Sequence, residues 1–116
     1  MKQIIAVIQP SRLPRVREAA RRFAGFPGMT VDKVDGFSPS SGSNESAPAG
    51  GIRSELTEYS PKVRLMILAP DHLIYAIAEL IHDCCHSGER GDGLIWTVPV
   101  DETIRIRDSY RPGDRT

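Results

Sequence analysis

A glycine-rich stretch at residues 87–96 contains the residue types best suited to binding a ligand. It reads Ser-Gly-Glu-Arg-Gly-Asp-Gly-Leu-Ile-Trp and connects a predicted helix to a predicted strand. Gly88, Gly91 and Gly93 allow this connection to expose consecutive backbone N–H groups, which bind anions such as phosphate. An ordinary turn between a helix and a strand has a similar composition, so the glycines alone leave both interpretations open.

Two arginines near the end of the sequence favour the anion-binding interpretation. Arg105 and Arg107 are separated by one residue within a short predicted strand. Side chains two positions apart on a strand project from the same face, so both guanidinium groups are expected to point the same way. Glycine amides together with two aligned guanidinium groups predict a phosphate-binding site.

The length and charge of the chain restrict its class. It has 116 residues, the size of one domain with a small core, so oligomerisation is an expected source of stability. Basic and acidic side chains both number 15, so no general attraction to nucleic acid is expected. The sequence begins with an apolar strand pattern, lacks an apolar run of transmembrane length, and has two adjacent cysteines that fit reduced thiols. These features predict a cytoplasmic protein.

Apolar periodicity predicts the order strand, helix, strand, strand, helix, strand, followed by a short fifth strand. This order predicts an α+β fold, a ferredoxin-like βαββαβ sandwich with one antiparallel sheet and both helices on one face. The other face of the sheet is expected to meet a partner. Residues 1–110 are expected to form one domain, followed by a polar tail at 111–116. The expected strands are 2–9, 29–37 (with a possible bulge before Gly36), 62–69, 94–100 and 103–107, and the helices begin near Pro14 and, with Asp71 as N-cap candidate, near residue 71.

A long polar segment separates the second and third predicted strands. Residues 38–60 are rich in Ser, Gly, Ala, Pro and Asn and contain few apolar side chains. Structureless connections longer than about 12 residues are uncommon in compact domains unless they are functional. We therefore expect a loop that orders when a ligand or partner arrives, although a tolerated surface insertion would look the same.

The sequence resembles the PII signal-transduction family, the nitrogen regulatory proteins P-II, over residues 1–107. These are trimeric ferredoxin-like proteins that bind adenine nucleotides in clefts between subunits and regulate transporters and enzymes through a long loop. The matching blocks keep their order and nearly constant spacing. They are Ile-Ile-Ala-Val-Ile-Gln-Pro at 4–10, Val-Arg-Glu-Ala at 16–19, Gly-Met-Thr-Val at 28–31, Val-Asp-Gly-Phe at 34–37, Pro-Lys-Val at 61–63, Gly-Asp-Gly at 91–93 and Ile-Arg-Ile-Arg at 104–107.

This resemblance implies a role for each candidate residue. It implies a regulatory protein and not an enzyme, with residues 38–60 as the effector loop. Gly88, Gly91, Asp92 and Gly93 belong to the implied phosphate-holding loop, which Arg105 and Arg107 approach from a neighbouring subunit. The resemblance also implies that Thr30 and the backbone near Leu68 recognise the adenine, and that Gly36 and Phe37 line the cleft.

Three departures from the family pattern concern the outer phosphates. Leu94 stands where the family usually has Lys or Arg, the loop begins Ser-Pro-Ser at 38–40 where an Arg and a Gln are usual, and Met66 replaces a common acidic residue. Losing a basic partner of a phosphate costs about 1.5 to 3 kcal/mol. We therefore expect ADP or AMP to bind in preference to ATP, with no ordinary use of 2-oxoglutarate. Arg90, inside the glycine-rich stretch, is expected to restore part of the missing charge.

The altered loop also suggests a smaller effector anion. Lys62 and this loop, next to a bound nucleotide, are expected to accept bicarbonate, because some PII-like proteins are associated with inorganic carbon and carboxysomes. The loop's only tyrosine, Tyr59, lies at its base, so the family's usual tyrosine modification is not expected.

Two alternatives remain open from the sequence. His82, Cys85 and His86 have metal-ligand spacing, as in a metal-binding trimer resembling the divalent-cation tolerance proteins. The favoured interpretation places these histidines at a helix C-terminus with the cysteine packed inward, so no metal site is predicted. The other alternative is a conventional nitrogen regulator that senses ATP and 2-oxoglutarate.

Overall fold

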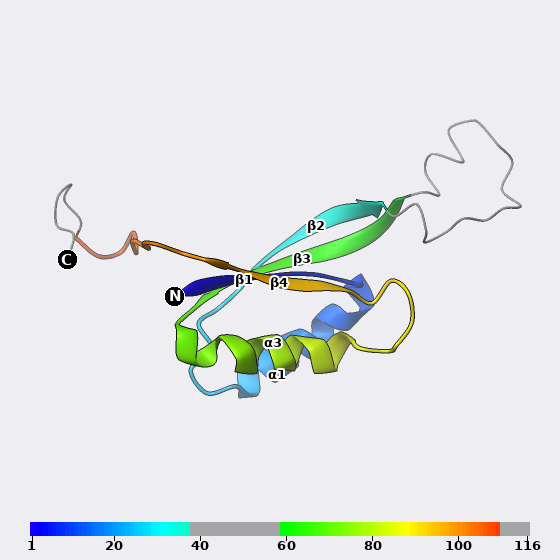
Figure 1. The fold of residues 1–116 in the computed structure, drawn as a ribbon, viewed down its shortest axis with the longest axis horizontal. Coiled ribbons are helices and arrows are strands. Elements are labelled where there is room, and N and C mark those ends of the chain that lie inside the picture. Colours follow the sequence, from blue (N-terminus) through cyan, green and yellow to red (C-terminus); the bar gives the residue numbers. More distant parts are fainter. Residues whose placement is uncertain (38–58, 110–116) are drawn as a thin grey trace, which may run out of the picture.

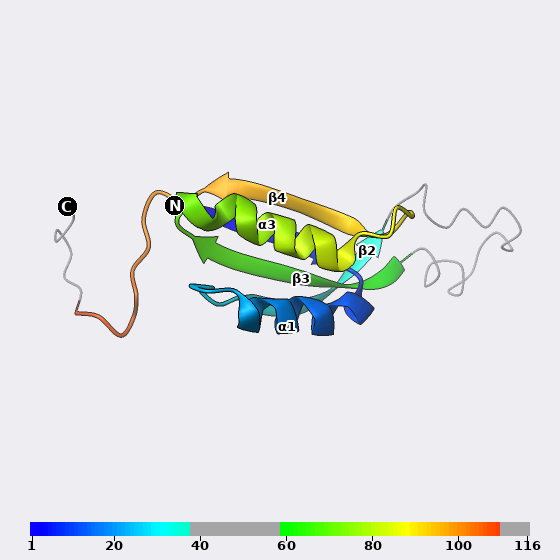
Figure 2. The same ribbon diagram turned by 90° about the horizontal axis from the view of Figure 1, so that it is seen from below.

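The chain folds into one four-stranded antiparallel sheet covered on one face by two helices. The computed structural model describes residues 1–37 and 59–109. The strand order is β2-β3-β1-β4, and α1 and α3 lie side by side beneath the sheet (Figure 1 and Figure 2). The predicted α+β, ferredoxin-like arrangement is thereby confirmed. The elements are β1 (Lys2–Ile8), a 3-10 turn η1 (Pro10–Arg12), α1 (Leu13–Arg22), β2 (Thr30–Phe37), β3 (Tyr59–Ala69), α3 (Asp71–Cys85) and β4 (Gly93–Pro99).

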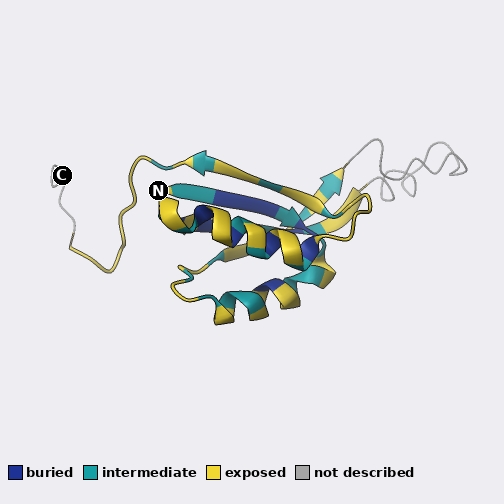
Figure 3. Cartoon of the chain, turned by 60° about the horizontal axis from the view of Figure 1, so that its bottom comes forward, coloured by how far each residue is buried: buried dark blue, intermediate teal, exposed yellow. Residues whose placement is uncertain are grey.

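The core lies between the sheet and the helices. Along β3, the alternate residues Val63, Leu65 and Ile67 are buried against the helices, as the alternating pattern predicts. Figure 3 shows the buried residues gathered between the layers, with the outer helix surfaces exposed. The remaining fully buried large side chains come from β1 and from one face of each helix, and they are Ile4, Ile8, Val16, Ile74, Ile77 and Ile81.

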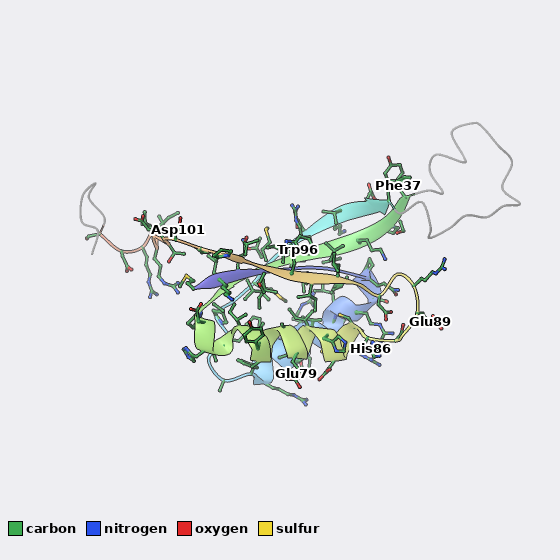
Figure 4. The ribbon with its side chains drawn as sticks, in the orientation of Figure 1. Phe37, Glu79, His86, Glu89, Trp96 and Asp101 are labelled. Carbon is green, nitrogen blue, oxygen red and sulfur yellow. The ribbon has the colours of Figure 1, made fainter. Side chains whose placement is uncertain are left out.

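The opposite face of the sheet carries an apolar patch and is uncovered in the described chain. Ile5 pairs with both Met66 and Trp96, so the three side chains share that face. Ile5 is only 8% exposed because its neighbours surround it, whereas Trp96 is 41% exposed (Figure 4). Leu94, on the same face, is 66% exposed. An exposed apolar face of this kind is typical of an interaction surface.

The third strand begins earlier than the sequence predicts. Tyr59 and Ser60, assigned above to the loop, pair with Phe37 and Gly36, and the register is continuous, so the expected bulge before Gly36 is absent from β2. Pro61 is tolerated because β1 pairs with β3 only as far as Val63, which leaves one side of β3 free at Pro61. Tyr59 and Ser60 therefore belong to β3 and not to the predicted loop, and the rest of that prediction, residues 38–58, lies outside the described residues.

The predicted fifth strand is wrong. Residues 102–105 are extended but belong to no strand, and a turn follows them, closed by a hydrogen bond from the Asp108 N–H to the Arg105 carbonyl oxygen. Lys2, the first residue of β1, pairs with Pro99, and the Val100 N–H bonds to the Met1 carbonyl, so the sheet has no backbone left for the segment that follows. Alternation alone marks a strand, but a strand also needs a hydrogen-bonding neighbour.

The first turn of α3 also differs from its predicted form. Pro70 occupies the N-cap position without a side-chain hydrogen bond, and Asp71 lies one residue inside the helix. The Asp71 carboxylate instead pairs with the Met1 ammonium group at 2.8 Å, and this hydrogen bond lowers the pKa of Asp71.

Gly93, where β4 begins, provides a test of the β1–β4 junction. Its φ is +117°, and a Cβ there would overlap the Val7 carbonyl oxygen, so Gly93→Ala adds backbone strain and overpacking. We expect the variant to lose about 2–5 kcal/mol of unfolding free energy in urea denaturation.

Gly88→Ala is the matched control for this loss. Gly88 also has a positive φ, +85°, but its Cβ would meet nothing within 4 Å. The control should lose only about 1–2 kcal/mol. Equal losses in the two variants would show that backbone strain alone, and not contact with β1, constrains Gly93.

Candidate functional site

The connection between α3 and β4 is organised by Asp92. Its carboxylate accepts hydrogen bonds from the backbone N–H groups of Ser87 (2.8 Å) and Gly88 (2.9 Å) and from the Ser87 hydroxyl. The Ser87 Oγ in turn accepts a bond from the Glu89 N–H at 3.2 Å. Donation by Ser87 and Gly88, with the nearby charge of His86, lowers the pKa of Asp92 to about 2. Asp92 thus fixes the shape of the loop by binding within its own chain.

This geometry gives two of the predicted phosphate-binding residues, Gly88 and Asp92, a structural role within the loop. The Gly88 N–H points at Asp92 in this structure, so it is occupied before any external anion arrives. The predicted phosphate contacts of Gly88 and Asp92 stay predictions. Both residues contribute directly to the conformation of the loop.

Gly91 links this loop to two neighbouring strands. Its carbonyl oxygen accepts hydrogen bonds from Lys62 Nζ (2.9 Å) and from Gln9 Nε2 (3.0 Å). Gly36 belongs to the same place, because a Cβ built on it would lie 3.1 Å from Lys62 Cγ. We call Gln9, Gly36, Lys62 and Gly91 the glycine-loop group. The structure therefore brings together three residues that the sequence predicted and adds a fourth, Gln9.

A second group of predicted residues lines a cavity of about 670 Å³. Thr30, Leu68, Arg105 and Arg107 all contribute to its walls, together with Met66. Thr30 lies opposite Met66 in the β2–β3 pairing, and the arginines come from the segment after β4, with Arg107 in its turn. We call Thr30, Leu68, Arg105 and Arg107 the arginine group.

The two groups lie at opposite ends of the sheet. Gly36 and Thr30 are six residues apart on β2, and Lys62 and Leu68 are six apart on β3. At 3.3 Å per residue, each pair spans roughly 20 Å along the strand. Phe37 lies at the end of β2 nearest the glycine-loop group, where its ring is 5.5 Å from that of Tyr59. One chain does not bring the predicted nucleotide residues into one site.

Comparison with known proteins connects this arrangement to a family. The family model for the nitrogen regulatory protein P-II matches residues 1–110. Among curated proteins, the chain is 34% identical over 114 residues to the nitrogen regulatory protein P-II of Azospirillum brasilense, covering 98% of each chain. It is 36% identical over 107 residues to P-II of Haemophilus influenzae and to P-II 1 of Escherichia coli K12, covering 92% of each chain in both cases. The chain belongs to the P-II family.

The histidine and cysteine cluster of this P-II family member was the basis of the metal-binding alternative. The His82 and His86 rings stack with centroids 4.9 Å apart, and His82 Nδ1 lies 3.1 Å from Asp83 Oδ1. Burial raises the pKa of the Cys85 thiol to about 11. Residues 1–37 and 59–109 contain no cluster of three His, Cys, Asp or Glu side chains placed to hold a metal ion.

The same described residues were searched for membrane spans. None of the helices within them has the length and apolar character needed to cross a bilayer.

The low pKa of Asp92 predicts how the loop of this P-II family member responds to acid. An unperturbed aspartate has a pKa of about 3.9. Because folding depresses the pKa, the loop bonds contribute fully above pH ~4 and are lost as the pH falls through about 2. We expect the Ser87 and Gly88 amide resonances to shift with a midpoint near pH 2 in an NMR titration.

Asp92→Asn is the control for this titration, since it keeps the shape of the side chain but removes the ionisable group. Its Ser87 and Gly88 resonances should show no such transition. A wild-type midpoint near pH 4, with the amides of the buried α3 residues unchanged, would show that Asp92 does not hold the loop.

Proposed function

We propose that this P-II family member is a cytoplasmic signalling protein that binds an adenine nucleotide in clefts between the subunits of a homotrimer. ADP or AMP is preferred over ATP, and the bound state is passed through the loop after β2 to a target, a membrane transporter or an enzyme. The protein acts as a regulator and not as an enzyme. The observation that carries this proposal is the division of its ligand residues into two groups at opposite ends of one sheet.

Two neighbouring subunits would together form the nucleotide site, because each subunit keeps the two groups of ligand residues apart. The glycine-loop group of one chain supplies a cation and a rigid loop, while the arginine group of its neighbour supplies two guanidinium groups and an adenine pocket beside Thr30 and Leu68. The apolar patch on the open face of the sheet, which includes Trp96, provides a surface on which such an assembly would bury apolar area. Assembly and nucleotide binding would then depend on each other.

A subunit-mixing experiment tests this shared site. Lys62→Glu places a carboxylate beside the phosphates, and the Arg105→Glu, Arg107→Glu double variant does so from the other side. Each variant alone should bind ADP at least tenfold more weakly than wild type. Co-refolding the two variants should recreate some sites of wild-type affinity, because the intact halves of different chains meet.

Each variant refolded alone is the control, with thermal unfolding used to confirm that it remains folded. If calorimetry of the mixture detects no site of wild-type affinity, the two groups do not meet between subunits.

The preference for ADP or AMP rests on Leu94. This side chain directly follows Gly93 and is 66% exposed on the open sheet face, so an apolar group stands at the end of the glycine-rich loop. The outer phosphate of ATP would lie beside Leu94 and lack the cation that a Lys at this position would supply. The other phosphates would still have cationic partners in Lys62 and the arginine group. Arg90 lies within the same loop and is proposed to compensate in part.

Lys62 also supports bicarbonate as a co-effector. Its ammonium group bonds to the neutral Gly91 carbonyl, and no carboxylate within residues 1–37 or 59–109 forms an ion pair with it. The three N–H donors of an ammonium group would allow Lys62 to bind a small anion as well as a phosphate of the nucleotide beside it. The second candidate is a nitrogen regulator that responds to ATP and 2-oxoglutarate. The names of the relatives in Azospirillum brasilense and Escherichia coli support its nitrogen-regulatory role.

Calorimetric titration with AMP, ADP and ATP with Mg²⁺ distinguishes the two candidates. We expect ADP or AMP to bind tightest, with affinity raised by bicarbonate and unaffected by 2-oxoglutarate at constant pH. Leu94→Lys should strengthen ATP relative to ADP by about tenfold, because it restores a charge at the outer phosphate. Leu94→Met, which changes the shape without adding charge, should leave the ratio as in wild type.

Three other outcomes of these titrations would contradict parts of the proposal. Tightest binding of ATP with Mg²⁺ by the wild-type protein would support the conventional regulator and exclude the ADP preference. An affinity indifferent to bicarbonate would remove bicarbonate as co-effector. The absence of binding by all three nucleotides would show that this chain keeps the family fold without its nucleotide site.

A further inference from the structure

The Gly91 carbonyl is held by two donors of different charge. Lys62 Nζ is a cation at 2.9 Å, and Gln9 Nε2 is a neutral amide donor at 3.0 Å. Both lie just beyond the last β1–β3 pair: Ile8, the last residue of β1, pairs with Val63, so Gln9 after β1 and Lys62 within β3 occupy the next position on each side. A carbonyl oxygen has two lone pairs, so the two donors together saturate it.

The two donors differ in what they would do when an anion arrives. The bond from the Lys62 ammonium group to the neutral Gly91 carbonyl is already charge-assisted, but a bond to an anion adds the attraction between two full charges. Lys62 would therefore gain by turning from the Gly91 carbonyl to a phosphate or another anion. Gln9 carries no charge and would gain nothing comparable, so it would stay on the carbonyl.

We infer that Gln9 is a positioning residue that retains the loop at Gly91 while Lys62 exchanges from the loop to the anionic ligand. The inference deepens the proposed function and rests on it. Without Gln9, the Gly91 carbonyl and the anion would compete for Lys62, so Lys62 would either hold the loop or bind the anion. With Gln9 the ligand gains the full charge of Lys62 and the loop keeps its conformation.

The neighbouring backbone explains why the carbonyl must be retained. Gly91 has a φ of +90°, and a Cβ there would lie 3.6 Å from Gln9 Nε2 and 3.7 Å from Lys62 Nζ, so both donors pack directly against its backbone. Gly93, two residues later, is fixed against Val7 of β1. The Asp92 bonds fix the other side of the loop, at Ser87 and Gly88. Between these two fixed parts of the loop, the Gly91 carbonyl is held by the side chains of Gln9 and Lys62.

A double-mutant cycle on ADP binding tests the exchange. Gln9→Met removes the donor at similar length, and Lys62→Met removes the cation. Exchange predicts that Gln9→Met weakens ADP binding about three- to tenfold when Lys62 is present. In the Lys62→Met background the loss should be less than twofold, because no ammonium group is left to be divided between the loop and the anion. Lys33→Met is the control for lost charge, since Lys33 lies on β2 and pairs with Val63, on the other face of the sheet from Lys62. It should change the affinity less than twofold.

The sign of the coupling separates exchange from simple support of the loop. If the two side chains merely share the task of holding Gly91, each compensates for the other, and Gln9→Met would cost more in the Lys62→Met background than in the wild-type background. That result, or equal costs in both backgrounds, would overturn the inference while leaving nucleotide binding intact. A wild-type protein that binds no adenine nucleotide would overturn the proposed function, and the inference with it.

A second measurement uses the wild-type protein, so it does not depend on how the variants fold. Saturating ADP should shift the Gly91 carbonyl ¹³C resonance, because the carbonyl loses its cationic donor, while the Gln9 side-chain amide resonance should hardly move. Movement of the Gln9 amide with an unchanged Gly91 carbonyl would contradict the exchange.

Discussion

The register in which β1 pairs with both of its neighbours is the constraint on which the rest of this structure depends. Ile8 lies opposite Val63 on one side and Gly93 on the other, so β1 ends and β4 begins at the same edge of the sheet, next to the part of β3 that carries Lys62. The glycine-rich loop enters the sheet at that edge and therefore lies beside Lys62. A shift of one residue along β3 would turn Lys62 toward the helices and carry its charge away from the loop.

The parts of the fold that depend on periodicity were predictable from the sequence. The alternation of Val63, Leu65 and Ile67, and the helical spacing of Ile74, Ile77 and Ile81, place these residues in the core, where the structure has them. The fifth strand failed because alternation describes one strand, whereas a ladder depends on what lies beside it.

The candidate site was predictable in its residue types but less so in its contacts. Glycines, Lys62 and the two arginines are recognisable from their chemistry, and the family blocks give them an order. Asp92 between two glycines is typical of a turn, so nothing in the sequence predicts that its carboxylate accepts hydrogen bonds from Ser87 and Gly88. Gln9 was missed because an amide side chain at a strand end belongs to no motif. Extending the antiparallel register of β1 and β3 by one position would have placed it next to Lys62.

The strand β4 has a consequence for communication within an assembly. It begins at the glycine-rich loop and ends just before the segment that carries Arg105 and Arg107. If clefts form between copies of the chain, the two ends of β4 belong to different clefts, and every cleft in a closed ring is joined to the next by the same short strand. Hydrogen bonds to β1 along its whole length make β4 a stiff connection. A displacement of the loop in one cleft would then move the arginines of the adjacent cleft, so the occupancies around the ring would be cooperative and not independent.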